Sequence, residues 1–357
     1  MAEKHVFRFG KDANGNKGIN NCTSDNGSPV PTILELAKAA GKSVGAVTTT
    51  ELTHATPAAT YSHICHRDAA YAIAEQAVPG GAGFNQALGD GVDVLMGGGA
   101  NHWTPYSASN KGGRADGRDL TAELTARGYR YVTTKDELSA VNSGKVLGLF
   151  STKSHLDYEL DRVAKGAAST QPSLSEMTAK AIDLLSQNSQ GYFLMVEGGR
   201  IDHALHATNA KRSLTDAVAL DEAVKTALGK VDLSDTLIVV TADHDHTMTI
   251  NGYSAKGNKV LDLVKNADGS TQNDADGKPF TTLVFGNGPN RQDQRPTLTS
   301  DEVMADDYLQ ETGVKLGSET HGGGDVMLFA GGAGSSQFKG TLDNTRVFGK
   351  LREALGL

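Results

Sequence analysis

Short apolar runs typical of β-strands alternate with helical segments along most of the chain, and no other feature constrains the fold as strongly. Strands are expected at Ser43–Thr50, Val92–Met96, Tyr129–Thr133, Lys145–Phe150, Tyr192–Val196, Thr236–Thr241, Thr281–Phe285 and Asp325–Ala330. Helices are expected at Thr32–Ala40, Ala69–Gln76, Leu120–Arg127, Leu174–Gln187, Leu214–Leu228, Ser300–Leu309 and Leu342–Leu355. This alternation predicts an α/β fold with a mostly parallel central sheet and helices on both of its faces.

Polar stretches define the expected domain organisation. Residues 1–30 are rich in Gly, Asn and Ser and are predicted to form an irregular N-terminal segment. Residues 31–357 are predicted to form a single α/β domain. Two turn-rich stretches, Asn101–Asp119 and Gly252–Pro296, are interpreted as insertions on that domain. The Asp and Asn residues of the second stretch could bind calcium, but we prefer the interpretation as a solvated loop.

Charge and cysteine content exclude some classes of protein. The net charge of −8 argues against a general nucleic-acid binder, and a phosphate ligand would need a local positive site. No apolar run of about 18 residues is present, so no membrane span is expected. The N-terminus has no apolar segment of the signal-peptide type, so the protein is not exported or its leader is absent from this chain. Cys22 and Cys65 could form a disulfide or remain thiols, so they leave the compartment open.

Candidate metal ligands follow the strand expected at Thr236–Thr241. The apolar, β-branched run reads as a buried strand, and Asp243 and His244 come directly after it. Active sites of open α/β sheets gather at the carboxyl ends of strands. Carboxylate oxygen and imidazole nitrogen are ligands that zinc takes in proteins.

A second set of candidate ligands comes from two other segments. Glu197 ends another apolar strand, and Asp202 and His206 are four residues apart, which places them on one face of a helical turn. A solvated helix start is the alternative interpretation. His321 precedes three glycines, which allow close backbone packing around the imidazole, although a lone His in such a loop is usually a turn residue. Asp202, His206 and His321 would supply the three protein ligands of a catalytic zinc.

Oxygen donors and one arginine extend the candidate site. Thr56 offers a hard oxygen that is suitable for Mg²⁺ beside Glu197. Arg67 could hold two phosphate oxygens in a bidentate fork. A competing structural interpretation makes Thr56 a helix N-cap with Pro57 at the first helical position, and this does not exclude a ligand role.

Taken together, these segments resemble the alkaline phosphatase family, which hydrolyses phosphate monoesters with two zinc ions and one magnesium ion. The resemblance runs from about residue 29 to the C-terminus and is carried by Pro31–Gly41, Thr53–Ala59, Leu95–Ala100, Val196–His203, Thr241–His244 and Thr320–Gly323. Several ordered motifs are more specific than any one of them. The resemblance implies that Asp202, His206 and His321 bind the first zinc, and that Asp243 and His244 contribute to the second.

The resemblance also implies roles for the remaining candidates. Thr56 and Glu197 belong to the magnesium site, and Arg67 holds the substrate phosphate. His54 and His203 occupy positions near the metals where bacterial relatives often carry Asp and Lys. Family members are commonly periplasmic or extracellular homodimers, so both properties are expected here, with small phosphate monoesters as substrates.

One part of the family pattern is missing from this sequence. The nucleophile of the family is the Ser of an Asp-Ser-Ala motif upstream of the segment that matches Pro31–Gly41, and this chain contains no Asp-Ser-Ala. The N-terminal strand of the family, which ends in an Asp that bridges zinc and magnesium, is also not found. The second zinc then keeps two protein ligands, one fewer than is usual. We therefore expect an uncovered sheet edge or apolar face and strongly reduced hydrolysis.

Other functions stay open on the sequence alone. A metal- and phosphate-binding homologue without turnover fits the missing Ser. A phosphodiesterase or a cofactor-independent phosphoglycerate mutase of the same superfamily would use a nucleophile placed elsewhere, although the motifs at 54–56 and 320–323 fit the phosphatase pattern better. A soluble α/β protein with scattered histidines is disfavoured, because too many candidate ligands follow strand ends.

Overall fold

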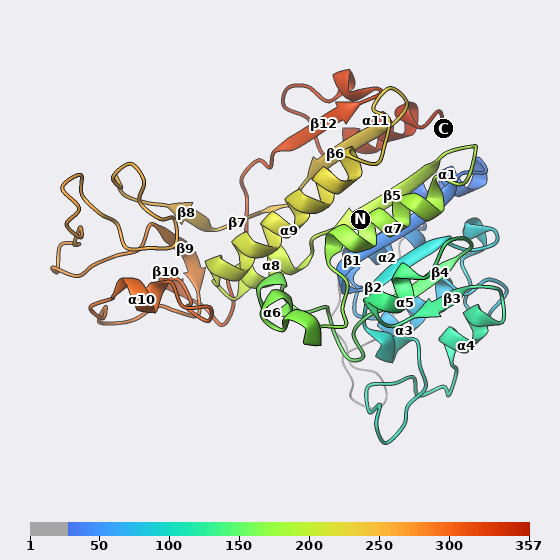
Figure 1. Ribbon diagram of the computed structural model, residues 1–357, viewed down its shortest axis with the longest axis horizontal. Helices are drawn as coiled ribbons and strands as arrows, with labels where there is room; N and C mark the ends of the chain where they lie inside the picture. Colours follow the sequence, from blue (N-terminus) through green and yellow to red (C-terminus); the bar gives the residue numbers. More distant parts are fainter. Residues whose placement is uncertain (1–27) are drawn as a thin grey trace.

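A five-stranded parallel sheet is the largest sheet of the computed structural model, which describes residues 28–357 (Figure 1). Its strand order is β3-β4-β2-β1-β5. The predicted parallel α/β sheet is therefore confirmed. Most of the irregular segment predicted for residues 1–30 falls outside the described residues, as does Cys22, and residues 28–30 have no regular secondary structure.

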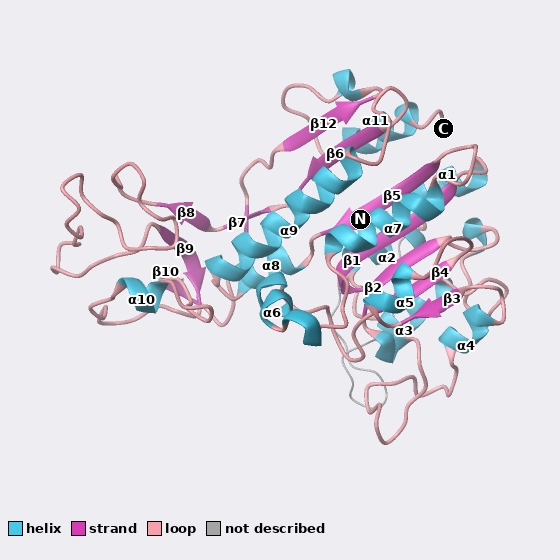
Figure 2. Cartoon of the chain, in the orientation of Figure 1, coloured by secondary structure: helices cyan, strands magenta, loops and turns pink. Residues whose placement is uncertain are grey.

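Most elements expected in the first two thirds of the chain are observed with similar boundaries, whereas the short helices at Lys135–Ser139 and Glu159–Ala164 were not expected. The strands are β1 (Ser43–Glu51), β2 (Val94–Gly98), β3 (Arg130–Val132), β4 (Val146–Leu149), β5 (Tyr192–Glu197), β6 (Leu237–Thr241), β7 (Asp245–His246), β8 (Met248–Ile250), β9 (Leu283–Gly288), β10 (Thr312–Lys315), β11 (His321–Gly322) and β12 (Leu328–Gly332). The α-helices are α1 (Ile33–Ala39), α2 (Ala55–Tyr61), α3 (Ala70–Gln76), α4 (Leu120–Thr125), α5 (Lys135–Ser139), α6 (Glu159–Ala164), α7 (Leu174–Leu185), α8 (Arg200–His206), α9 (Ala210–Leu228), α10 (Ser300–Val303) and α11 (Thr345–Ala354). Figure 2 shows how these helices and strands are distributed.

Helices cover both faces of the five-stranded sheet, and each face has its own apolar core. Because successive side chains of a strand point to opposite faces, Ala46 of β1 packs into the core that contains Leu34 of α1 and Tyr61 of α2. Val47, the next residue, packs into the core that contains Met177 of α7. This double coverage explains why Val44–Val47 of β1 and the whole of β2 are apolar and buried.

The strand expected at Thr236–Thr241 differs from its prediction. We expected a buried strand of the central sheet, but β6 pairs antiparallel with β12 in a separate two-stranded sheet and its residues are half-buried or exposed. Within residues 28–357, the strand pairings give β5 only β1 as a neighbour and β6 only β12, so each keeps one open edge. The apolar side chains of β6 therefore lack the neighbours that would bury them. The expected uncovered sheet edge agrees with this arrangement.

The segment from β8 to β10 forms a lobe away from the five-stranded sheet, at the left of Figure 1. Its sheet has the order β10-β9-β8, and the loop between β8 and β9 holds isolated bridges instead of regular elements. The predicted insertion at 252–296 thus contains one strand, β9. The helix expected at Ser300–Leu309 is shorter than predicted and ends at Val303. Among the described residues, no helix is long and apolar enough to cross a membrane.

A buried carboxyl group next to the sheet gives a prediction about the pH dependence of stability. Asp216 of α9 is 4% exposed and accepts a hydrogen bond from the backbone N–H of Glu159. Burial raises the pKa of this carboxyl group to about 7. Because the pKa is higher in the folded state, the stabilisation is complete below the unfolded pKa near 4 and is lost as the pH rises through 7.

We therefore expect Asp216→Asn to raise the free energy of unfolding at pH 8 by up to about 4 kcal/mol, and by much less at pH 5. The asparagine keeps an acceptor for the N–H of Glu159 and removes the buried charge. Urea denaturation of both proteins at the two pH values measures this difference. An equal change at pH 5 and pH 8 would contradict the assignment.

Candidate metal centre

The centre of the site is built on the short helix that follows β5. The chain leaves β5 at Glu197, passes Gly198 and Gly199, and enters α8, which carries Asp202 and His206. Their four-residue spacing places Asp202 Oδ1 3.3 Å from His206 Nε2. The predicted common helical face is confirmed.

His321 reaches the same point from a distant part of the sequence. It lies on β11, which pairs antiparallel with β7 and aligns His321 with His246. A Cβ atom on the next residue, Gly322, would lie 2.8 Å from both Asp245 Oδ2 and the His246 carbonyl oxygen. Only glycine fits there, so the glycine-rich loop does allow the close packing that the sequence suggested.

Asp202, His206 and His321 lie at the separations that a tetrahedral zinc site needs. Asp202 Oδ1 is 3.3 Å from His206 Nε2 and 3.5 Å from His321 Nε2, and the two Nε2 atoms are 3.1 Å apart. Ligand bonds of about 2.0–2.2 Å at tetrahedral angles place neighbouring ligand atoms roughly 3.3–3.5 Å apart. The His206 Nδ1–H donates to the carbonyl oxygen of Glu319 at 2.6 Å, which leaves its Nε2 lone pair for a metal. These residues therefore fit zinc.

Asp243 and His244 lie beside this set. Asp243 Oδ2 is 3.3 Å from His244 Nε2, and His244 Nε2 is 3.8 Å from Asp202 Oδ1. The His244 ring stacks on His321 with centroids 3.5 Å apart. Asp243 is exposed, so a cation on this side of the centre would face solvent. The structure brings the predicted pair together and close to the first set.

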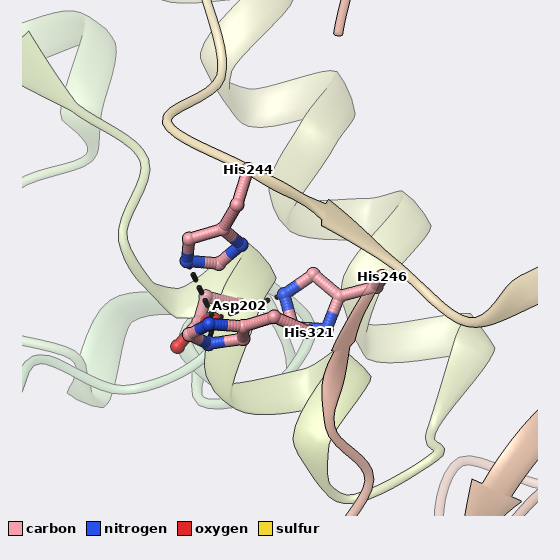
Figure 3. Close-up of side chains that lie close together, drawn as sticks. All are labelled: Asp202, His244, His246 and His321. Carbon is pink, nitrogen blue, oxygen red and sulfur yellow. Dashed lines mark hydrogen bonds and ion pairs between the residues drawn. The ribbon is translucent and has the colours of Figure 1, made fainter. Parts of the chain in front are cut away.

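His246 completes a ring of histidines around Asp202, as Figure 3 shows for His244, His246 and His321. Its Nε2–H donates to Asp202 Oδ1 at 2.9 Å and its Nδ1–H donates to Glu319 Oε2 at 2.7 Å. Burial opposes protonation of this ring, but the two carboxylates outweigh it and raise the pKa of His246. Because both of its ring nitrogens already have carboxylate partners, His246 supports Asp202 instead of offering a free nitrogen to a metal, although it lies within both compact donor clusters.

The charges around Asp202 favour its ionised form. Burial alone would raise the pKa of this carboxyl group. The hydrogen bond from His246 and the nearby imidazoles of His206 and His203 outweigh that effect, and the pKa of Asp202 is lowered. A carboxylate that is ionised well below neutral pH is ready to bind a metal cation.

Thr56 and Glu197 also meet, at the carboxyl end of β5. The hydroxyl groups of Thr48, Thr50 and Thr56 hydrogen-bond to the Glu197 carboxylate. Burial raises the pKa of Glu197 in spite of these bonds. A hard cation would relieve that cost, because carboxylate and hydroxyl oxygens are the ligands that Mg²⁺ prefers.

The interpretation of Thr56 as a helix N-cap is wrong. The N-cap of α2 is His54, which makes Thr56 the second helical residue and Pro57 the third. Pro57 is tolerated there because the N–H groups of the first turn have no partner within the helix. As Thr56 does not cap the helix, its hydroxyl is available to Glu197.

Three histidines form a second cluster, and two of them, His54 and His203, lie within electrostatic range of Asp202. The rings of His54, His155 and His203 have centroids 4.3–5.4 Å apart. Burial is the largest cause that lowers their pKa values, to about 4, 3 and 4 respectively, so all three are neutral at pH 7. The Nδ1 of His155 accepts the Glu51 backbone N–H, and the Nδ1 of His203 accepts from Arg200. Both rings therefore carry their proton on Nε2 and can donate from it.

Arg67 lies on the loop after α2 and is exposed. Its positive charge acts on His54 and helps to lower the pKa of that histidine. The predicted phosphate-binding arginine is therefore within electrostatic range of the histidine cluster, with its guanidinium group open to solvent.

Sequence reasoning assigned no role to His155, His246 or Glu319. His155 follows the carboxyl end of β4, where functional side chains of α/β sheets gather, and this position could have revealed it. His246 lies two residues after His244, and Glu319 lies two residues before His321. In an extended segment, side chains two residues apart point to the same side. The two-residue spacing from a candidate ligand could therefore have identified His246 and Glu319 as residues near the site.

Comparison with known proteins agrees with this arrangement. A family model described as alkaline phosphatase matches residues 11–357. The chain belongs to the alkaline phosphatase family. The tissue-nonspecific alkaline phosphatase of Gallus gallus is 40% identical over 338 residues, which are 87% of this chain and 63% of that protein. A membrane-bound alkaline phosphatase of Bombyx mori is 37% identical and is matched over 61% of its length.

Solved alkaline phosphatases share the fold. The enzyme of Thermus thermophilus is 37% identical, with a TM-score of 0.56 over 67% of this chain and 47% of that one. A variant of the enzyme from the Antarctic bacterium TAB5, with Mg bound in its M3 site, is 25% identical, with a TM-score of 0.62 over 92% of this chain and 76% of that one. The chain spans less than two thirds of the length of the Gallus gallus and Bombyx mori relatives.

Proposed function

We propose that this protein hydrolyses phosphate monoesters with the help of zinc and magnesium ions. The observation that carries this proposal is the separation of 3.1–3.5 Å among the metal-facing atoms of Asp202, His206 and His321. Such spacing between side chains from two distant segments is what a tetrahedral cation needs. Membership of the alkaline phosphatase family supports the reaction class.

Each cation has its proposed ligands. Asp202, His206 and His321 would hold the first zinc, and Asp243 with His244 would contribute to the second. Thr56 and Glu197 would hold magnesium, and the TAB5 relative with Mg bound supports the use of this metal in the family. When bound, such ions supply Lewis acidity that lowers the pKa of a nucleophile and stabilises a leaving oxygen.

The residues of the chain would bind and orient the substrate. The guanidinium group of Arg67 would donate hydrogen bonds to two phosphate oxygens. This attraction would offset the repulsion between the phosphate and a protein with a net charge of −8. His155 and His203 would donate from Nε2 to a third oxygen or to a bound water, because their Nδ1 atoms already accept hydrogen bonds. His54 would line the same region as a neutral imidazole.

The nucleophile limits the activity expected of these 357 residues. They contain no Asp-Ser-Ala sequence, so the formation of a phosphoserine intermediate has no identified acceptor here. We propose strongly reduced turnover for this chain by itself. The same observation favours a second candidate function, the binding of metal and phosphate without turnover.

Hydrolysis of p-nitrophenyl phosphate and of its diester analogue, with zinc and magnesium at alkaline pH, tests these proposals. Slow hydrolysis of the monoester above a His321→Ala control supports the phosphatase. Zinc and phosphate binding without turnover supports the second function. Faster hydrolysis of the diester would contradict both and favour a phosphodiesterase.

We also propose a periplasmic or extracellular location and a homodimer. The location rests on likeness to the family, and so does the homodimer. Size-exclusion chromatography with light scattering measures the oligomeric state of the purified chain.

Arg67→Ala is expected to weaken the binding of inorganic phosphate by at least about 10–100-fold, because even one charge-assisted hydrogen bond contributes roughly 1.5–3 kcal/mol. Zinc content should stay unchanged. Isothermal titration of the zinc-loaded protein with phosphate measures the affinity. Arg130→Ala is the matched control, since Arg130 is exposed on β3 at the far edge of the sheet. Unchanged phosphate affinity in Arg67→Ala would remove Arg67 from the site.

A further inference from the structure

Glu319 is a buried acid that supports the candidate metal centre in two different ways. It is 2% exposed and lies two residues before His321, in the segment that leads into β11. A buried carboxylate is costly unless its oxygens are hydrogen-bonded. The hydrogen-bond partners of the Glu319 carboxylate therefore indicate its role in the candidate metal centre.

Both carboxylate oxygens of Glu319 have assigned partners. Oε1 accepts from the Thr247 backbone N–H at 2.6 Å and from the Thr247 hydroxyl at 2.7 Å. Oε2 accepts from His246 Nδ1–H at 2.7 Å. The Thr247 contacts fix the plane of the carboxylate, and the remaining oxygen is aimed at His246.

His246 passes this orientation on to Asp202. Its Nε2–H donates to Asp202 Oδ1 at 2.9 Å, and this same oxygen lies 3.3 Å from His206 Nε2 and 3.5 Å from His321 Nε2. Without an acceptor at Nδ1, the His246 ring could turn away from Asp202. Through His246, the carboxylate of Glu319 thus fixes the position of Asp202 Oδ1, the oxygen that faces His206 and His321.

The backbone of Glu319 acts on the other side of the site. Its carbonyl oxygen accepts the His206 Nδ1–H at 2.6 Å, which leaves the Nε2 of His206 without a proton and facing Asp202 and His321. One residue therefore orients Asp202 through its side chain and His206 through its main chain. Such outer hydrogen bonds typically set metal affinity by a factor of about 10–100.

We propose that Glu319 is a positioning residue of the metal centre, which holds Asp202 through His246 and fixes the tautomer of His206 without binding the metal itself. The proposal rests on the proposed function, because it assumes a cation held by Asp202, His206 and His321. The alternative is that Glu319 is itself a ligand, together with His206 and His246, whose donor atoms also lie close together.

Zinc titration of three variants separates these roles. Glu319→Ala removes the acceptor for His246, so zinc affinity should fall by about 10–100-fold. Glu319→Gln should stay within a few-fold of the wild type, because its amide oxygen can accept from Thr247 and its NH₂ group can donate to His246 Nδ1, which keeps Nε2–H on Asp202. Glu35→Ala is the matched control, since Glu35 is also buried and hydrogen-bonded to a histidine, His63, yet lies on α1; its zinc affinity should not change.

Equal loss of zinc in Glu319→Gln and Glu319→Ala would overturn the proposal in favour of a ligand role. Unchanged affinity in Glu319→Ala would overturn it as well. The metal-free protein gives an independent readout by ¹⁵N–¹H NMR of the imidazoles. We expect a slowly exchanging Nδ1–H on His246 that disappears in Glu319→Ala, and an Nδ1–H tautomer for His206. Absence of these two imidazole signals from the wild-type spectrum would overturn the proposal. If the wild type shows both signals but binds no zinc, the proposed function alone is refuted.

Discussion

Replacing Asp202 by alanine is expected to remove about one zinc ion per chain, with an affinity at the first site reduced by about 100-fold or more. The reason is geometric. Asp202 Oδ1 lies within 3.8 Å of a nitrogen of His206, His244, His246 and His321, so one oxygen serves as the common partner of all four rings. Loss of a direct ligand should cost at least as much as loss of an outer hydrogen bond, which is about 10–100-fold.

Metal analysis after equilibration with a zinc buffer measures this effect. Asp221→Ala is the control, because Asp221 is an exposed acid on α9, outside the site. Its zinc content should equal that of the wild type. If Asp202→Ala keeps its full zinc content, Asp202 is not a ligand and the proposed centre is wrong.

The second large effect is a contrast between His321→Ala and His244→Ala. His321 belongs to a proposed set of three ligands, whereas His244 shares its proposed site only with Asp243, which is exposed. Two protein ligands should bind zinc much more weakly than three. We therefore expect His321→Ala to lose the tight zinc, and His244→Ala to keep it and lose the weak one.

Titration with a zinc-sensitive dye resolves the two affinities. The wild type should show one tight and one weak step, and each variant should lack a different step. Loss of the same step in both variants would mean that the two histidines share one ion. Because the rings of His244 and His321 stack with centroids 3.5 Å apart, a shared ion is the main alternative to two separate zinc sites.

The central sheet could be predicted because its signals are local. Val44–Val47 of β1 and the whole of β2 are apolar runs, and the parallel arrangement followed from the helices that alternate with the strands. Asp202 and His206 were predictable for the same reason, since four residues are one helical turn. Each of these inferences needs only the spacing of residues within one segment.

One error concerns contacts between segments, and the other concerns the start of a helix. The apolar run of β6 read as buried, but burial depends on which strands lie beside it, and β6 pairs only with β12 among the described residues. Thr56 and Pro57 matched a helix-start pattern, whereas α2 begins earlier and frees the Thr56 hydroxyl.

The roles of His246 and Glu319 depend on long-range geometry in the same way. Their hydrogen bond joins residues that are 73 positions apart in the sequence. Spacing within the Asp243–His246 motif could place His246 near the site, but only the fold shows that both of its nitrogens are already engaged. The sequence alone could not distinguish a ligand from a support.

A crystal structure of the zinc-loaded chain, with anomalous diffraction recorded at the zinc edge, tests the central claim most directly. We predict an anomalous peak within about 2.0–2.2 Å of an Asp202 carboxylate oxygen and of the Nε2 atoms of His206 and His321. His246 should remain hydrogen-bonded between Asp202 and Glu319. A zinc ion bound to His246 or Glu319 would contradict the account, and so would the absence of a peak among Asp202, His206 and His321.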